Sequence, residues 1–155
     1  MDLCFDSAVD IAASVRSGET SPVAVVDAFL DRIDARGDVT NAFINVLRAD
    51  ARSRAREIEA QLESGADLPL AGVPVAMKDL SETKAGVPNT MGVRAFSDNV
   101  AEATSVTIRR LEAAGAIVIG TTNTPELGHL VRTDNLLQGP TSTPFDPSRN
   151  AGGSS

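Results

Sequence analysis

The stretch Gly72-Val73-Pro74-Val75-Ala76-Met77-Lys78-Asp79 decides how this chain folds. Its apolar part, residues 73–77, predicts a strand that enters the interior, with Pro74 near the start, where the missing N–H costs least. Residues 104–114 then predict a helix whose Ile108 and Leu111 face inward. A buried strand over residues 116–119, ending at Gly120, is expected next. Strand, helix and strand in this order are typical of a parallel α/β unit.

The sequence before this unit, residues 1–65, is expected to be mainly helical. A first helix follows a capping Ser7 and stops at Gly18. A second begins with Ser21 as cap and Pro22 in the first turn, and is expected to end before Gly37. Its predicted apolar stripe consists of Val23, Val26, Phe29, Leu30 and Ile33. A short strand over residues 42–47 precedes a third helix from about residue 49, which has a narrow seam of Ala51, Ala55, Ile58 and Leu62 and a solvated charged face.

Long loops characterise residues 72–155, the predicted α/β part. Residues 79–102 show no convincing period, and structureless connections of that length within a compact domain are usually either functional or wrongly assigned. After Gly120, small and polar residues dominate; Pro125 can open one short helix, and turns are expected at Gly139-Pro140 and residues 144–147.

Composition narrows the function classes. The 155 residues, 42% hydrophobic and 23% charged, fit one soluble domain and exclude fibrous and disordered chains. No apolar run is long enough to cross a bilayer, and no signal peptide is visible, so we expect a cytoplasmic protein. A net charge of -7 disfavours direct binding to nucleic acid or anionic membranes. One cysteine and one histidine predict neither a disulfide nor a metal site, and we expect no cofactor.

Lys78 is the first candidate for chemistry, because the only other lysine is Lys84, which we interpret as a loop charge. Burial disfavours the charged ammonium, so a lysine behind an apolar strand can serve as a general base, whereas arginine stays protonated. The alternative is that Lys78 reaches water and pairs with Asp79.

The second candidate is the run Gly152-Gly153-Ser154-Ser155, which combines a permissive backbone with two small hydroxyls but can equally be a plain loop. A triad of serine, His129 and Asp134 is disfavoured, because any chain contains these residue types. Cys4 lacks a basic neighbour that would favour its thiolate.

Several segments together resemble the amidase signature family. They are residues 72–79, residues 115–126 (Gly-Ala-Ile-Val-Ile-Gly-Thr-Thr-Asn-Thr-Pro-Glu), Gly139-Pro140-Thr141 and Gly152-Gly153-Ser154-Ser155. The resemblance covers essentially the whole chain and implies an α/β fold: the N-terminal part of a mixed β-sheet core covered by helices on both faces, incomplete here. Residues 1–155 would then be an N-terminal fragment of a single amidase domain.

The resemblance implies a serine hydrolase of amides that uses a lysine, a serine in a cis peptide linkage and a second serine as nucleophile. Carried over by motif, Lys78 is the base and Ser154 the bridging serine, with Gly153 and Ser155 in supporting roles. Gly128 is a candidate backbone contact to the substrate, within a stretch that resembles the acyl side of the family's pocket. The expected partner is a small-molecule amide, and a homodimer stays open.

One departure from the family concerns the nucleophile, which the family places further along in another Gly-Gly-Ser segment that residues 1–155 lack. We therefore expect the 155-residue chain alone to be inactive and to fold poorly. Two alternatives to a simple amidase stay open. One is the glutaminase-like A subunit of an aspartyl/glutamyl-tRNA amidotransferase; the other is a non-catalytic truncated product that acts only as a binding or assembly partner.

Overall fold

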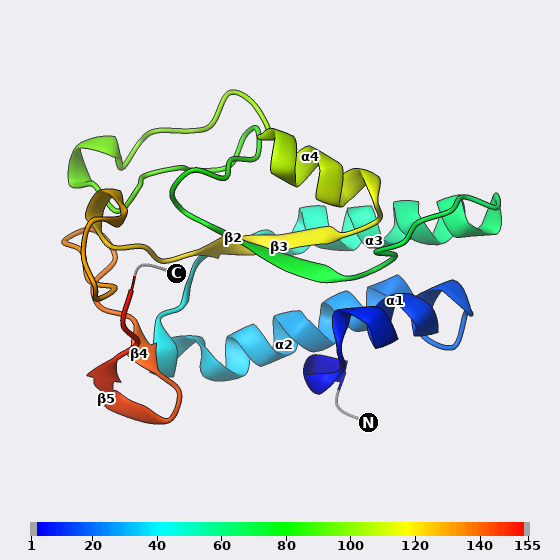
Figure 1. Cartoon of the computed structure of the whole chain (residues 1–155), viewed down its shortest axis with the longest axis horizontal. Helices are drawn as coiled ribbons and strands as arrows, with labels where there is room; N and C mark the ends of the chain where they lie inside the picture. Colours follow the sequence, from blue (N-terminus) through cyan, green and yellow to red (C-terminus); the bar gives the residue numbers. More distant parts are fainter. Residues whose placement is uncertain (1–2, 154–155) are drawn as a thin grey trace. The chain divides into compact units, whose positions relative to one another are not determined.

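The computed structural model describes residues 3–153 of the chain. In order along the chain, its helices, 3-10 turns (η) and strands are η1 Leu3–Phe5, α1 Ala8–Arg16, α2 Pro22–Thr40, β1 Phe43–Val46, α3 Arg48–Glu63, β2 Pro74–Lys78, η2 Arg94–Phe96, α4 Val106–Ala113, β3 Ile117–Thr122, η3 Glu126–Gly128, β4 Ser142–Thr143 and β5 Asp146–Asn150. The fold is therefore α/β, as the sequence predicts (Figure 1).

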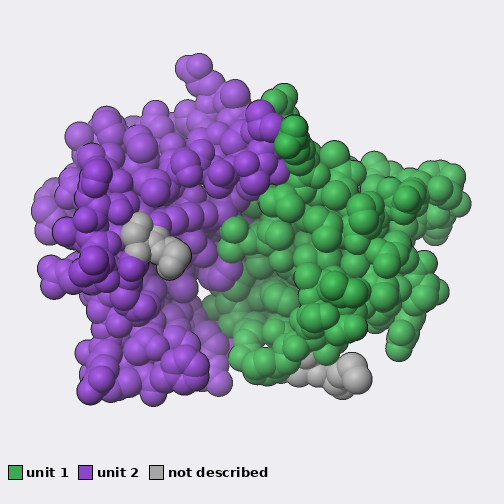
Figure 2. Space-filling model, viewed as in Figure 1, with its two compact units in different colours: residues 1–33, 47–76, 109–119 green, residues 34–46, 77–108, 120–155 purple. Residues whose placement is uncertain are grey.

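Two compact units divide the described chain (Figure 2). The first unit contains the residues up to 33, 47–76 and 109–119; the second contains 34–46, 77–108 and those from 120 on. Among the described residues, no helix is long and apolar enough to cross a membrane.

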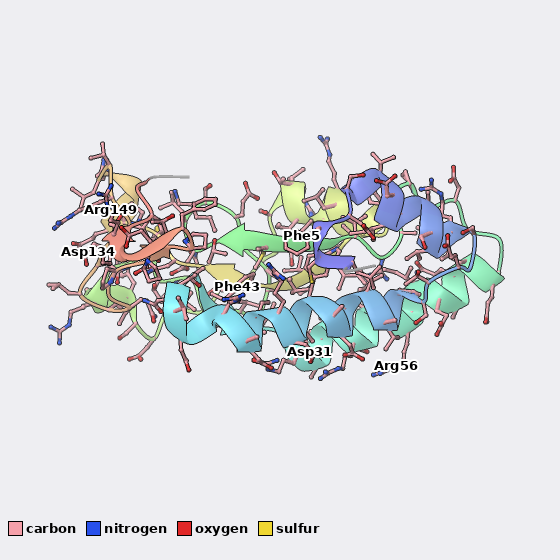
Figure 3. All side chains as sticks on the ribbon, turned by 90° about the horizontal axis from the view of Figure 1, so that it is seen from below. Phe5, Asp31, Phe43, Arg56, Asp134 and Arg149 are labelled. Carbon is pink, nitrogen blue, oxygen red and sulfur yellow. The ribbon has the colours of Figure 1, made fainter. Side chains whose placement is uncertain are left out.

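In the first unit, α1 and α3 match their predictions. Ser7 caps α1, because its hydroxyl oxygen accepts a hydrogen bond from the Asp10 N–H at 3.2 Å. Three residues of the predicted α3 seam, Ala51, Ala55 and Ile58, are at most 1% exposed. Side chains on the outer faces, such as Asp31 of α2 and Arg56 of α3, point away from the strands (Figure 3).

The charged face of α3 is not entirely solvated, which corrects the prediction. The Arg52 guanidinium contacts the Asp27 carboxylate of α2 at 2.7 Å. Arg54 donates to the Glu112 carbonyl at 2.8 Å. These long side chains therefore tie α3 to its neighbours.

Helix α2 differs from its prediction at its end. It continues through Gly37 to Thr40, and Asn41 follows with a left-handed φ of 49°. A single glycine is tolerated within a helix, whereas asparagine is one of the few residues that readily adopt the left-handed conformation that ends one. The buried stripe also differs: Val25, Val26 and Leu30 are fully buried, whereas Val23, Phe29 and Ile33 are only half-buried.

The three-stranded sheet has the order β1-β3-β2. Strand β1 pairs antiparallel with β3. Along β2 and β3, Ile117 donates to the Val73 carbonyl and Asp79 to the Thr122 carbonyl, so these two strands are parallel and the sheet is mixed. The parallel strand–helix–strand unit predicted from the sequence is thus confirmed.

Strand β3 continues through Gly120 to Thr122, beyond its predicted end. A Cβ atom at Gly120 would overlap the carbonyl oxygen of Asn45 and lie 3.0 Å from the Phe43 ring. Glycine is therefore needed inside this strand because β1 approaches closely, and it does not mark a strand end.

The C-terminal segment contains two short strands that sequence reasoning missed. Strands β4 and β5 form an antiparallel hairpin whose turn lies within the predicted turn region, residues 144–147. Arg149 of β5 pairs with the Asp146 carboxylate at 3.2 Å. The short helix predicted at Pro125 is the 3-10 turn η3.

Candidate active site

Lys78 is the last residue of β2 and is half-buried, directly after Met77, which is 2% exposed. Strand β2 stays next to β3 as far as Thr122, the last residue of β3, whose hydroxyl donates to the Met77 carbonyl at 3.3 Å. Lysine thus lies where the sequence predicts it, at the point where an apolar strand leaves the sheet.

Asp79 is almost completely buried, at 1% exposure. Its carboxylate accepts hydrogen bonds from the Thr90 N–H at 2.8 Å and from the Thr90 hydroxyl at 2.5 Å. The Asn89 side-chain amide donates to it at 3.2 Å. A buried carboxylate requires such donors to offset the loss of hydration.

The loop after Asp79 is an ordered excursion and not a structureless connection. Antiparallel backbone hydrogen bonds join its two arms, from Asn89 to the Asn99 carbonyl and from Ala101 to the Val87 carbonyl. At the base, the Thr83 hydroxyl donates to the Ala103 carbonyl at 2.8 Å. These pairs connect residues 10 to 20 positions apart, which is why the sequence shows no local period.

Two buried amides, Asn123 and Asn135, organise the segment after β3, and sequence reasoning did not single them out as a pair. Asn135 donates to the Asn123 side-chain oxygen and to the Thr124 carbonyl, both at 2.8 Å. Asn123 in turn donates to the Thr141 hydroxyl at 3.0 Å. A Cβ atom at Gly92, in the loop after Asp79, would lie 3.0 Å from the Thr124 carbonyl oxygen, so this loop packs directly on the segment.

Gly128 lies in the η3 turn with a φ of 72°, directly after Leu127 with a φ of 52°. Its N–H donates to the Pro125 carbonyl, whereas the Leu127 N–H donates to the Met91 carbonyl. Met91 is also left-handed, with a φ of 52°. Left-handed Met and Leu residues are uncommon and persist only where the surrounding structure holds them, which often happens at functional sites.

The Gly152-Gly153 segment is held against residues 130–133. The Thr133 N–H and hydroxyl both donate to the Gly152 carbonyl, at 2.7 and 2.8 Å. A Cβ atom at Gly153 would lie 2.9 Å from the Leu130 carbonyl oxygen. Close backbone approach therefore requires glycine at position 153. Ser154 and Ser155 lie outside the described residues.

All the described candidates, Lys78, Gly128 and Gly153, belong to the second unit. The Asp134 carboxylate pairs with the Arg132 guanidinium at 3.4 Å, and His129 is exposed. Cys4 belongs to the first unit and contacts the Ala28 carbonyl at 3.5 Å. The donors to the Asp79 carboxylate, next to Lys78, are Asn89 and Thr90, and not His129 or Cys4.

A family model described as Amidase matches residues 24–155. The chain belongs to the amidase signature family. An acylamidase of Rhodococcus erythropolis is 41% identical over 96% of this chain and 31% of its own length. The A subunit of the glutamyl-tRNA(Gln) amidotransferase of Salinispora tropica is 43% identical over 99% of this chain and 31% of its own length.

The fold agrees with this assignment. A bacterial aryl acylamidase of the amidase signature family superposes with a TM-score of 0.91 at 36% identity, covering 97% of this chain and 31% of that one. The chain thus spans about a third of the length of these relatives.

Proposed function

We propose that residues 1–155 form the N-terminal part of an amidase that hydrolyses a carboxylic amide to an acid plus ammonia or an amine. The observation that carries the proposal is Lys78 at the exit of β2, inside the segment that matches the amidase family. The nucleophilic serine and the oxyanion-hole donors are proposed to lie outside these residues, since the amidase relatives are about three times longer.

The proposed mechanism is a relay of three groups. The Lys78 amine accepts a proton from the Ser154 hydroxyl, and Ser154 accepts one from the nucleophilic serine as that serine attacks the amide carbonyl. The relay then returns a proton to the leaving amine, which departs as the acyl-enzyme forms. Water repeats the sequence and releases the acid.

The other site residues have supporting roles in this proposal. Gly153 allows the chain to pass close to Leu130 and to lead into Ser154. Ser155 orients Lys78 or Ser154. Gly128 offers its carbonyl for a substrate contact, because its N–H already donates to Pro125.

Reading the coding DNA beyond Ser155 tests the proposal. An open frame that encodes a second Gly-Gly-Ser segment with a further serine is the expected result. An immediate stop codon would instead favour the non-catalytic alternative, a binding or assembly partner. The protein encoded by an open frame is then assayed for acid release from simple aryl amides.

A second candidate, the A subunit of a tRNA amidotransferase, is favoured by the Salinispora relative, whose identity to this chain is 43%, against 41% for the acylamidase. It predicts ammonia release from glutamine that depends on partner subunits, whereas a simple amidase needs none. The stretch over residues 128–135 resembles broad-specificity amidases, which places this candidate second.

We also propose a cytoplasmic location. Whether the protein is a homodimer is tested by light scattering.

A further inference from the structure

Asp79, the residue after the proposed base, carries a buried and hydrogen-bonded carboxylate. Asp79 has 1% of its surface exposed, and three donors from the following loop surround its oxygens. Burying a carboxyl group costs free energy unless its oxygens are hydrogen-bonded. The loop and the carboxylate therefore hold each other in one arrangement.

The backbone on either side of Asp79 is also fixed. The Asp79 N–H donates to the Thr122 carbonyl at the end of β3, at 3.0 Å. The Leu80 N–H donates to the Lys78 carbonyl at 2.8 Å, which closes a tight turn centred on Asp79. The main chain that carries the Lys78 side chain is thus anchored to β3 on one side and to the Asp79 turn on the other.

Thr90 connects this turn to the rest of the second unit. Its hydroxyl donates to Asp79 and accepts from the Gly92 N–H at 3.3 Å. Gly92 packs against the Thr124 carbonyl and the Asn135 amide. Hydrogen bonds therefore connect the turn beside Lys78 to Thr90 and Gly92, and Gly92 packs closely on the segment after β3.

We infer that Asp79 is a positioning residue: held by Thr90 and Asn89, its carboxylate fixes the turn that aims the Lys78 amine. This inference rests on the proposed function of Lys78 as the base. Asp79 acts through the backbone of its neighbour and through the loop, and it takes no proton in the relay. A small displacement of a base from its partner can cost a large factor in turnover.

Thr90→Val is the most informative variant, because valine keeps the shape and the backbone N–H but removes the hydroxyl that donates to Asp79. Thr90→Ser is its matched control, since serine restores that donor. Asp79→Asn is a second variant that keeps an acceptor for the Thr90 N–H and removes the charge. All are made in the complete protein and compared with Lys78→Ala.

Two measurements are made on each variant. The first is kcat and KM with an aryl amide. The second is the rate at which acetic anhydride acetylates Lys78 relative to Lys84, read by mass spectrometry of the two peptides. This ratio reports the surroundings of the Lys78 amine even if the protein is inactive. The absolute acetylation rate of Lys84, which lies in the same loop, shows separately whether the loop itself has changed.

We expect Thr90→Val and Asp79→Asn to lower kcat by about tenfold or more, with KM changed by less than about threefold. The Lys78-to-Lys84 acetylation ratio should change in both variants and stay at the wild-type value in Thr90→Ser. Wild-type kcat and acetylation ratio in Thr90→Val and Asp79→Asn would overturn the inference. A lower melting temperature with unchanged kcat and ratio would also overturn it, because the network would then be structural only. Full activity of Lys78→Ala would instead remove the lysine mechanism, while the acetylation ratio still tests the positioning role.

Discussion

Gly120 and Gly37 are expected to respond in opposite ways to the same substitution. At Gly120, in β3, an alanine methyl group would overlap the Asn45 carbonyl oxygen, and backbone atoms cannot move away cheaply. We predict that Gly120→Ala lowers the free energy of unfolding by about 1–3 kcal/mol or more. At Gly37, within α2, nothing lies within 4 Å of the added methyl group. Gly37→Ala should raise the free energy of unfolding by about 0.5–1 kcal/mol.

Urea denaturation of the two variants measures both changes under one set of conditions. Because each variant adds a single methyl group, each serves as the control for the other. Equal stability of Gly120→Ala and wild type would mean that β1 does not approach β3 as closely as described.

The buried amides show which single residues sequence reasoning could not identify. Asn123 is 8% exposed and Asn135 6% exposed, and their partners lie 11 to 18 positions away. A polar residue in a polar stretch gives no local sign that tertiary neighbours satisfy it. The position of Lys78 at the end of a strand could be predicted, because it directly follows an apolar run.

At the scale of elements, the Ser7 cap gives a direct test of α1. The Ser7 oxygen accepts from the Asp10 N–H, and the Ser7 hydroxyl donates to the Asp10 carboxylate at 2.6 Å. Ser7→Ala removes both bonds and is predicted to lower the free energy of unfolding by about 1 kcal/mol. Ser7→Asp, which retains a capping oxygen, should stay close to wild type in the same denaturation experiment. A stable Ser7→Ala variant would show that the cap contributes nothing.

The loop after β2 should be protected from hydrogen exchange although it has little regular structure. The amide hydrogens of Asn89, Thr90 and Ala101 all have defined acceptors. We predict that each exchanges at least about 100-fold more slowly than its unfolded reference rate. The amide of Ala55, inside α3, is the internal standard. Exchange of the loop amides at reference rates would contradict the ordered loop.

Elements with local signals were predictable, and their ends were not. Caps and spacing located α1, α3 and the strands β1 to β3. The end of α2 depends on Asn41 and not on Gly37, and the end of β3 depends on how far β1 pairs with it. Strands β4 and β5 are polar, and β5 contains Pro147, so only their turn was visible.

At the scale of the whole molecule, the described candidate residues gather in one of the two units. The chain spans about a third of the length of its relatives, so the proposed activity is to be assayed on the product of the whole reading frame. The family assignment itself depended on four separated segments taken together, whereas each segment alone was weak.

The central claim is that Lys78 is the base of an amidase, and turnover of the Lys78→Ala variant tests it most directly. Loss of a positioned general base is predicted to lower kcat for an aryl amide by about 100-fold or more. Lys84→Ala, which removes the only other lysine of these residues, should keep wild-type turnover. Both variants should melt near the wild-type temperature. Near-normal turnover by a folded Lys78→Ala protein would contradict the account.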